Sequence, residues 1–319
     1  MAMNRWQFQP GLSMSEFFER YGTEEKCGTA LFASRWPSGW RCPACQCASS
    51  SRFLRNGRRY WQCSAHHHQS TLISSTVFEV TKLPPTRWFQ AMHLPSQAKN
   101  NLSALDLMRH LGVCYKTALL MKHKLMEVTR LREDSRHLTG RVEIDDAYLG
   151  GDRSGGKPGR GSENKVSFVA AVQTTQDGQA VLACFAPLPF TKEAVSDFLH
   201  RSLVLPLTVV SEGLGCFTVA LGRGAVHDRE VTGGGKASVK LPKFNAVNTV
   251  LSNLKTALAG TYHSFHFAKY AYRCLAEVQY RFNRRFDLAA ILPRLLRAAA
   301  VTKPQPGRLL RTAEVCRVR

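Results

Sequence analysis

Two groups of residues in this 319-residue chain have side chains and spacings suited to binding metal ions. The first consists of two pairs, Cys42-Pro-Ala-Cys45 and Cys63-Ser-Ala-His66. A structural zinc ion takes four Cys or His ligands in a tetrahedron, and two such pairs supply them. The pattern therefore predicts a zinc site with no open position for catalysis. Three neighbouring side chains are alternatives to His66 as the fourth ligand: His67, His68 and Cys47.

The second group consists of acids on two expected strands. Asp145 lies in the motif VEIDD, where strand alternation puts it on the same face as Glu143. Glu212 ends the apolar stretch LTVVSE and precedes a glycine turn. Carboxylates clustered around two Mg²⁺ ions serve phosphoryl transfer, because the ions activate the attacking oxygen and stabilise the leaving one. We therefore expect Asp145 and Glu212 to meet in a metal site.

Local sequence signals predict the elements that hold the first half of the chain together. The zinc pairs flank a hairpin expected around the Asn56-Gly57 turn. Further on, Ser103 is the expected N-cap of a helix that Gly112 ends, and a second helix is expected near Tyr115. Two helices joined by a short turn with glycine are typical of a helix-turn-helix, whose second helix contacts DNA. The alternative is an ordinary helical hairpin.

The second half has the order of an RNase H-like core: three strands, a helix and a fourth strand. Strands are expected from Gly140, with a Gly- and basic-rich loop over residues 152–165 and a turn at Asp177-Gly178. A helix is expected at about 191–203, followed by the strand that ends at Glu212. A mostly helical region then runs from about Asn245 to Arg285, and the basic tail beyond Lys303 is expected to be a loose arm.

The composition indicates which kinds of molecule the protein binds and where it is located. The chain has 44 Lys and Arg against 23 Asp and Glu, a net charge of +21, which favours nucleic acid. Ten cysteines without an export signal argue against a disulfide framework. No apolar stretch approaches the ~20 residues that span a bilayer, so we expect no membrane partner and a cytoplasmic, nucleoid-associated location.

The sequence resembles a known family, the bacterial insertion-sequence transposases of the DDE class, in the ISXO-like group with an N-terminal zinc ribbon. The resemblance covers nearly the whole chain and includes the segments EFFERYGTEEKCGTALFASRWPSGWRCPAC, STVFEVTKLPPTRWF, VEIDDAYLGG and NTVLSNLKTALAGTYHSFHFAKYAYRCLAEVQYRFNRRFDL. It implies hydrolysis of DNA at transposon ends, followed by attack of the freed 3′-hydroxyl on target DNA. Self-association is also expected, because the two ends must be paired.

The resemblance also assigns roles to residues. It places the first catalytic aspartate at Asp145, the second at Glu212 and the third ligand at Asn248, with Lys255 seven residues later. Mg²⁺ or Mn²⁺ is the implied catalytic metal. Because the family has Asp where this chain has Glu212, an impaired copy that only binds DNA and represses transposition is the alternative function. A zinc-ribbon nuclease or resolvase is a third hypothesis.

Two acids compete with these assignments. Asp146 is the alternative to Asp145, although it shares a face with the apolar residues of its strand. Glu277 is the alternative third ligand, but a pair with Arg281 one helical turn later is the simpler interpretation.

The sequence as a whole predicts a multidomain α/β protein in four parts. These are a zinc-ribbon region (residues 1–75), a helix-turn-helix region (76–135), an RNase H-like catalytic domain (138–290) and a basic C-terminal arm (291–319). The expected DNA-contacting side chains are Lys116, Lys122, Lys124, Arg281 and Arg284.

Overall fold

The computed structural model of the protein describes residues 9–150, 165–231, 241–262 and 266–312. Contacts between residues divide the chain into two compact units. The N-terminal unit comprises Met1–Ala98, Leu102–Val128 and Phe286–Arg319, and the sheet unit comprises Lys99–Asn101 and Thr129–Arg285. Among the described residues, no helix is long and apolar enough to cross a membrane.

Two short helices that the sequence-based prediction lacks begin the N-terminal unit: α1 (Met14–Tyr21) and α2 (Glu24–Arg35). Ser13 starts α1 with a capping box. Its hydroxyl accepts a hydrogen bond from the N–H of Glu16 at 3.2 Å, while the Glu16 carboxylate accepts one from the N–H of Ser13 at 2.9 Å. Both helices pack against α3 (Pro85–Gln97).

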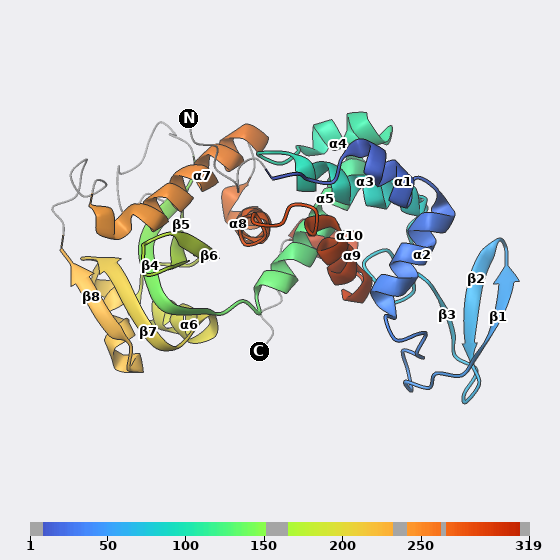
Figure 1. Ribbon diagram of the computed structural model, residues 1–319, viewed down its shortest axis with the longest axis horizontal. Helices are drawn as coiled ribbons and strands as arrows, with labels where there is room; N and C mark the ends of the chain where they lie inside the picture. The colour runs from blue at the N-terminus through green and yellow to red at the C-terminus, as the bar shows by residue number, and fades with distance from the viewer. Residues whose placement is uncertain (1–8, 151–164, 232–240, 263–265, 313–319) are drawn as a thin grey trace. The chain divides into compact units, whose positions relative to one another are not determined.

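The zinc-ribbon region contains a three-stranded antiparallel sheet in the order β1-β2-β3 (Figure 1). Its strands are β1 (Ser50–Arg55), β2 (Arg58–Cys63) and β3 (Gln69–Thr71). Asn56 and Gly57 connect β1 to β2 with φ angles of 49° and 71°. Two consecutive positive φ angles are the mark of a type I′ turn, which suits the twist of a tight hairpin. The predicted hairpin is therefore confirmed.

The predicted pair of helices is present as α4 (Ala104–Leu111) and α5 (Tyr115–Glu133). Ser103 is the N-cap of α4, and its hydroxyl accepts a hydrogen bond from the backbone of Asp106 at 3.1 Å. Gly112 ends α4 in the left-handed region, with φ of 62°, which a residue without Cβ adopts at little cost. The cap and the terminating glycine thus lie where the sequence placed them.

The C-terminal part corrects one prediction. Residues 291–319 were expected to form a basic arm, but α9 (Ile291–Val301) buries its apolar face and packs on α2 and α3. Arg297 holds it there by donating hydrogen bonds to the carbonyl groups of Ser34 and Arg35. A short helix, α10 (Gly307–Thr312), follows, and residues 313–319 lie outside the described part.

The sheet unit contains a five-stranded mixed sheet in the order β6-β5-β4-β7-β8. The first three strands form an antiparallel meander, and β7 and β8 run parallel to β4. This arrangement confirms the predicted RNase H-like order and adds β8, which was not predicted. The predicted Gly- and basic-rich loop lies largely outside the described residues. The elements in chain order are β4 (Leu138–Leu149), β5 (Val166–Thr174), β6 (Ala180–Pro187), α6 (Lys192–Ser202), β7 (Leu203–Glu212), η1 (Gly215–Arg223) and β8 (Val226–Glu230).

Helices cover both faces of this sheet (Figure 1). On one face, α6 and η1 enclose an apolar core with Val142, Ile144 and Val209 from the strands. On the other face lie α7 (Asn245–Thr261) and α8 (Phe267–Phe282). Because side chains alternate along a strand, Glu143 and Asp145 face α7 rather than this core.

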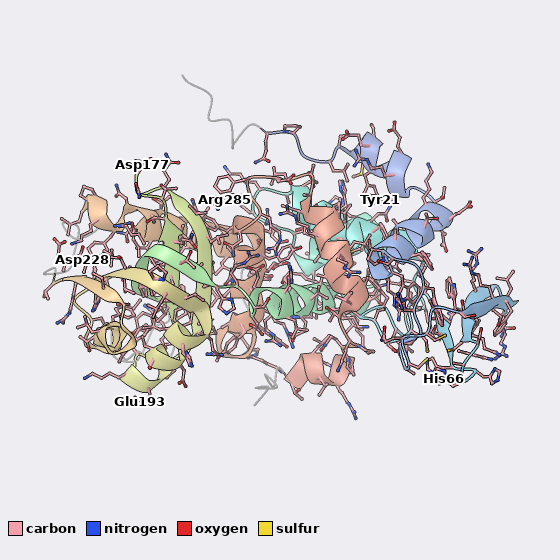
Figure 2. All side chains as sticks on the ribbon, turned by 60° about the horizontal axis from the view of Figure 1, so that its bottom comes forward. Tyr21, His66, Asp177, Glu193, Asp228 and Arg285 are labelled. Carbon is pink, nitrogen blue, oxygen red and sulfur yellow. The ribbon has the colours of Figure 1, made fainter. Side chains whose placement is uncertain are left out.

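Side chains at the end of α8 close the free edge of β6. Gln279 accepts a hydrogen bond from the backbone N–H of Phe185 at 2.8 Å. Asn283 accepts one from the N–H of Ala183 at 2.7 Å and donates one to the Ala183 carbonyl at 2.9 Å. Arg285, labelled in Figure 2, donates to the carbonyl of Val181 at 3.1 Å. These bonds replace those of a neighbouring strand, so the polar residues here have a structural use.

Candidate functional site

The four expected zinc ligands lie together. The ligand atoms of Cys42, Cys45, Cys63 and His66 all lie within 4.8 Å of one another. Sγ of Cys45 is 3.6 Å from Sγ of Cys63 and 3.6 Å from Nδ1 of His66. A tetrahedral zinc ion with ~2.3 Å Zn–S bonds separates its ligands by about 3.8 Å, so these distances fit zinc. His66 is labelled in Figure 2.

The backbone around Cys63 suits a thiolate ligand. Burial raises the pKa of the Cys63 thiol, but hydrogen bonds from the N–H groups of Ala65 and His66 and from side chains outweigh this effect and lower it to about 6. The thiolate is the form that binds metal. Cys47, an alternative ligand, contributes its carbonyl oxygen, which accepts a hydrogen bond from the N–H of Cys42 at 2.9 Å. Its Sγ lies 3.9 Å from the carbonyl of Ser49, whereas a ring nitrogen of His66 lies within 4.8 Å of the three cysteine sulfurs, so His66 fits best as the fourth ligand.

The two expected catalytic acids belong to adjacent parallel strands. In the register of β4 and β7, Ile144 lies opposite Ser211. The next residues are Asp145 and Glu212, so these acids lie side by side on the face that α7 covers. Both side chains are partly exposed. Oδ1 of Asp145 accepts a hydrogen bond from the N–H of Asp146 at 2.8 Å.

The row of acids continues into β8, which the sequence did not predict as a strand. Glu230 lies opposite Glu212 in the register of β7 and β8. The ammonium of Lys243 lies 2.7 Å from the carboxylate of Asp228 (labelled in Figure 2) and 3.3 Å from that of Glu230. The hydrogen bond to Asp228 raises the pKa of Lys243. Its charge thus offsets part of the repulsion between neighbouring carboxylates.

Helix α7, which carries the other two expected residues, packs on the sheet. The N–H of Val247 donates a hydrogen bond of 2.9 Å to Glu143 on β4. Asn248 follows directly and is half-buried, whereas Lys255 is exposed. Seven residues are about two helical turns, so both project from one side of α7. Glu277, the alternative ligand, accepts a hydrogen bond from the hydroxyl of Tyr262 at 2.7 Å.

Comparison with protein families identifies the two regions. Residues 137–283 match the ISXO2-like transposase domain, and residues 22–69 match the transposase zinc-ribbon domain. The chain belongs to the ISXO2-like transposase family. The matched ranges of this transposase include all four zinc ligands as well as Asp145, Glu212 and Asn248. No curated protein matched the sequence.

The three lysines expected to contact DNA have different surroundings on α5 of the transposase. Lys116 is exposed in the first turn of the helix. Lys122 is buried, and its ammonium donates a hydrogen bond to the carbonyl of Leu102. Lys124 donates to the carbonyl of Val77 at 2.9 Å, and burial lowers its pKa. Only Lys116 of the three is placed as a phosphate contact requires.

The two expected arginines are held inside the sheet unit. Arg281 donates a hydrogen bond to the carbonyl of Lys99 at 3.0 Å, and burial lowers its pKa. Arg284 is 5% exposed and forms an ion pair of 2.6 Å with Glu133. Its guanidinium also lies 3.4 Å from the ring centre of Tyr280. These contacts favour structural roles for both arginines.

Proposed function

We propose that the transposase binds the ends of an insertion sequence, cleaves DNA there and joins the freed ends to target DNA. The observation that carries this proposal is the placement of Asp145 and Glu212 on one face of two adjacent parallel strands. Helix α7 is bonded to the same face through Val247 and brings Asn248 with it. Together these residues present oxygen ligands from two strands and a helix, as metal-dependent phosphoryl transfer requires.

The donor set fits magnesium or manganese, because hard cations prefer oxygen ligands. Asp145 and Glu212 offer carboxylates, and Asn248 offers a carbonyl oxygen. The bound ions would activate the attacking oxygen and stabilise the leaving one. Among the described residues, the zinc ligands are the one group of three or more His, Cys, Asp or Glu side chains close enough to share a metal. This agrees with a third catalytic ligand that is an amide. Lys255 then supplies positive charge to the scissile phosphate.

The net charge of +21 supports binding of DNA, since the phosphate backbone dominates affinity for basic proteins. Within the helix-turn-helix, Lys116 lies exposed in the first turn of α5. The N-terminal turn of a recognition helix is the part that enters the major groove. The zinc ribbon and the helix-turn-helix together would hold the transposon ends. Pairing of two ends requires two copies of the chain, so self-association is part of the proposal.

A strand-transfer assay on labelled end-containing DNA with Mg²⁺ or Mn²⁺ tests the function. We expect the wild type to join the ends to target DNA and Asp145→Ala to abolish joining while retaining DNA binding. Glu193→Gln is the matched control. Glu193, labelled in Figure 2, is an exposed acid of α6, which packs on the other face of the sheet. An Asp145→Ala variant as active as the wild type would contradict the proposal.

Glu212→Asp tests the side chain that departs from the family pattern. Shortening the acid by one methylene is expected to raise the rate of strand transfer, because misplacement near 1 Å costs ~100-fold at a reacting centre. If Glu212→Asp joins DNA and the wild type only binds it, the chain is a DNA-binding repressor instead of an active enzyme. Cleavage restricted to branched DNA in every variant would indicate a resolvase.

A further inference from the structure

Glu143 is an acid in the sheet unit that neither the sequence nor the family match assigns to a role. Its side chain is buried, with 1% of it exposed. A carboxylate taken out of water is costly unless charges and hydrogen bonds replace its hydration. Glu143 has both, because Arg141 lies 2.6 Å from one oxygen and the N–H of Val247 lies 2.9 Å from the other.

The hydrogen bond from Val247 to Glu143 replaces an N-cap hydrogen bond that α7 lacks. The first N–H groups of a helix have no partner within the helix, and a side chain at the N-cap usually accepts from one of them. The N-cap of α7 is Phe244, which provides no such hydrogen bond. Val247 is the third residue of α7, so Glu143 on β4 fills the place of the missing cap. A negative charge at this position also interacts favourably with the helix dipole.

Arg141 extends the same connection to the segment that leads into α7. Its guanidinium donates to the hydroxyl of Thr174 on β5 at 2.8 Å and to the carbonyl of Lys243 at 3.0 Å. Glu143 and Arg141 on β4 therefore bond the entry of α7 at two points, the N–H of Val247 and the carbonyl of Lys243. The hydroxyl of Thr174 on β5 holds Arg141 in place for this contact.

The connection lies next to the proposed catalytic residues on both elements. Along β4, Asp145 is the next side chain after Glu143 on the same face, about 6.6–6.8 Å farther on. Along α7, Asn248 follows Val247. A shift of α7 against β4 would thus displace one metal ligand relative to the other, and the bond from Glu143 to Val247 opposes that shift.

We propose that Glu143 is a positioning residue of the catalytic site, which sets the separation of Asn248 from Asp145 by capping α7 from the neighbouring strand. This inference rests on the proposed function of that site. Glu143 is buried and both of its carboxylate oxygens are bonded within the sheet unit, so its loss should change how the site binds and uses metal, rather than whether the protein binds DNA.

The test uses Glu143→Gln in the full-length, zinc-loaded protein, with strand transfer measured over a range of Mg²⁺ concentrations. We expect kcat to fall ~10–100-fold, as for a displacement near 1 Å, with the KM for end DNA unchanged. The Mg²⁺ concentration for half-maximal rate should rise, and Mn²⁺ should restore part of the activity. Glu143→Asp keeps the charge but is one methylene shorter. It should lower kcat and raise the Mg²⁺ concentration for half-maximal rate less than Glu143→Gln does.

The matched control is Glu133→Gln, which removes a different buried Glu–Arg pair of the same 2.6 Å length in the sheet unit. Both variants should lower the melting temperature, but Glu133→Gln should keep the metal dependence of the wild type. A folded Glu143→Gln protein with wild-type kcat and wild-type metal requirement would overturn the proposal. If neither Glu143 variant folds, hydrogen exchange in the wild type decides, because the Val247 amide should exchange more slowly than the amide of Glu193 in the first turn of α6.

Failure of the proposed function gives a different pattern. If Asp145→Asn has the activity of the wild type, the assignment of the site fails whatever Glu143 does. If the wild type transfers no strands, calorimetric titration with Mn²⁺ replaces the assay. The expected order is then no binding at the site in Asp145→Asn, at least tenfold weaker binding in Glu143→Gln and wild-type binding in Glu133→Gln. Equal Mn²⁺ affinity of Glu143→Gln and wild type contradicts the positioning role.

Discussion

Glu212 holds its carboxylate one methylene farther from the strand than an aspartate would. Its neighbour in the next strand is Glu230, another acid, which is paired with Lys243. Replacing Glu212 by Asp should change the rate of the proposed reaction although it keeps the charge. Length alone separates Glu from Asp, and reacting centres tolerate little displacement.

Basic side chains of the same type have different roles depending on their surroundings, as Lys116 and Lys122 show. We predict that Lys116→Ala weakens binding to end DNA and lowers the slope of log K against log salt by about 1, the loss of one phosphate contact. Lys122→Met is the control. It removes a buried ammonium that bonds the Leu102 carbonyl, so it should lower stability and leave the slope unchanged. Equal slopes for Lys116→Ala and wild type, in fluorescence anisotropy titrations, would contradict this assignment.

Among the elements, the zinc ribbon depends most on a bound ion for its stability. Its short strands bury little besides Trp61 and Cys63, and these pack with Trp40 and Cys42 in a small cluster. A core of this size folds weakly alone, and binding of a structural zinc ion then supplies much of the folding free energy.

We therefore predict that a strong chelator unfolds the ribbon and leaves the sheet unit folded. All five tryptophans of the chain lie in residues 1–98, so their fluorescence reports the N-terminal unit, while far-UV circular dichroism also follows the sheet. Cys45→Ser should act like the chelator, and Cys47→Ser should retain one zinc ion per chain. Loss of zinc from Cys47→Ser, measured by atomic absorption, would instead make Cys47 a ligand.

Elements with strong local signals were predictable from sequence, and those defined by distant contacts were not. The Asn56-Gly57 hairpin and the Ser103 cap depend on a few adjacent residues, so they could be read from sequence. Strand β8 (VHDRE) is short and polar and is recognisable only through its pairing with β7. The place of α9 depends on contacts with α2 and α3, which are far away in the sequence. For the same reason the zinc ligands were predictable, while the role of Glu143 was not.

At the scale of the whole chain, the net charge and the buried charges act differently. The net charge of +21 favours binding to a polyanion. The pair of Arg284 with Glu133 instead joins residues 151 positions apart inside the sheet unit. Its partner could not be inferred from sequence, and so Arg284 resembled a DNA contact. Lys124 and Arg281 likewise bond carbonyl groups that are distant in the sequence, so sequence alone does not show that these basic residues are already occupied.

A double-mutant cycle should show the structural use of that pair. We predict that Arg284→Met and Glu133→Gln each lower the free energy of unfolding by about 3–5 kcal/mol, since each leaves an uncompensated buried charge or polar group. The double variant should lose less than the sum, because it leaves no isolated charge. Urea unfolding followed by circular dichroism measures all three. Strict additivity would mean that the two side chains do not depend on one another.

The closure of β6 by α8 has a consequence for synthesis of the chain. A ribosome completes β6 about a hundred residues before it reaches Asn283 and Arg285, an interval on the order of ten seconds at ~5–20 residues per second. During that interval the nascent strand lacks the side chains that later occupy its outer hydrogen-bonding groups. A premature stop before α8 would leave this strand permanently open to pairing with strands of other chains. Truncated copies of the gene should therefore yield aggregates rather than smaller soluble proteins.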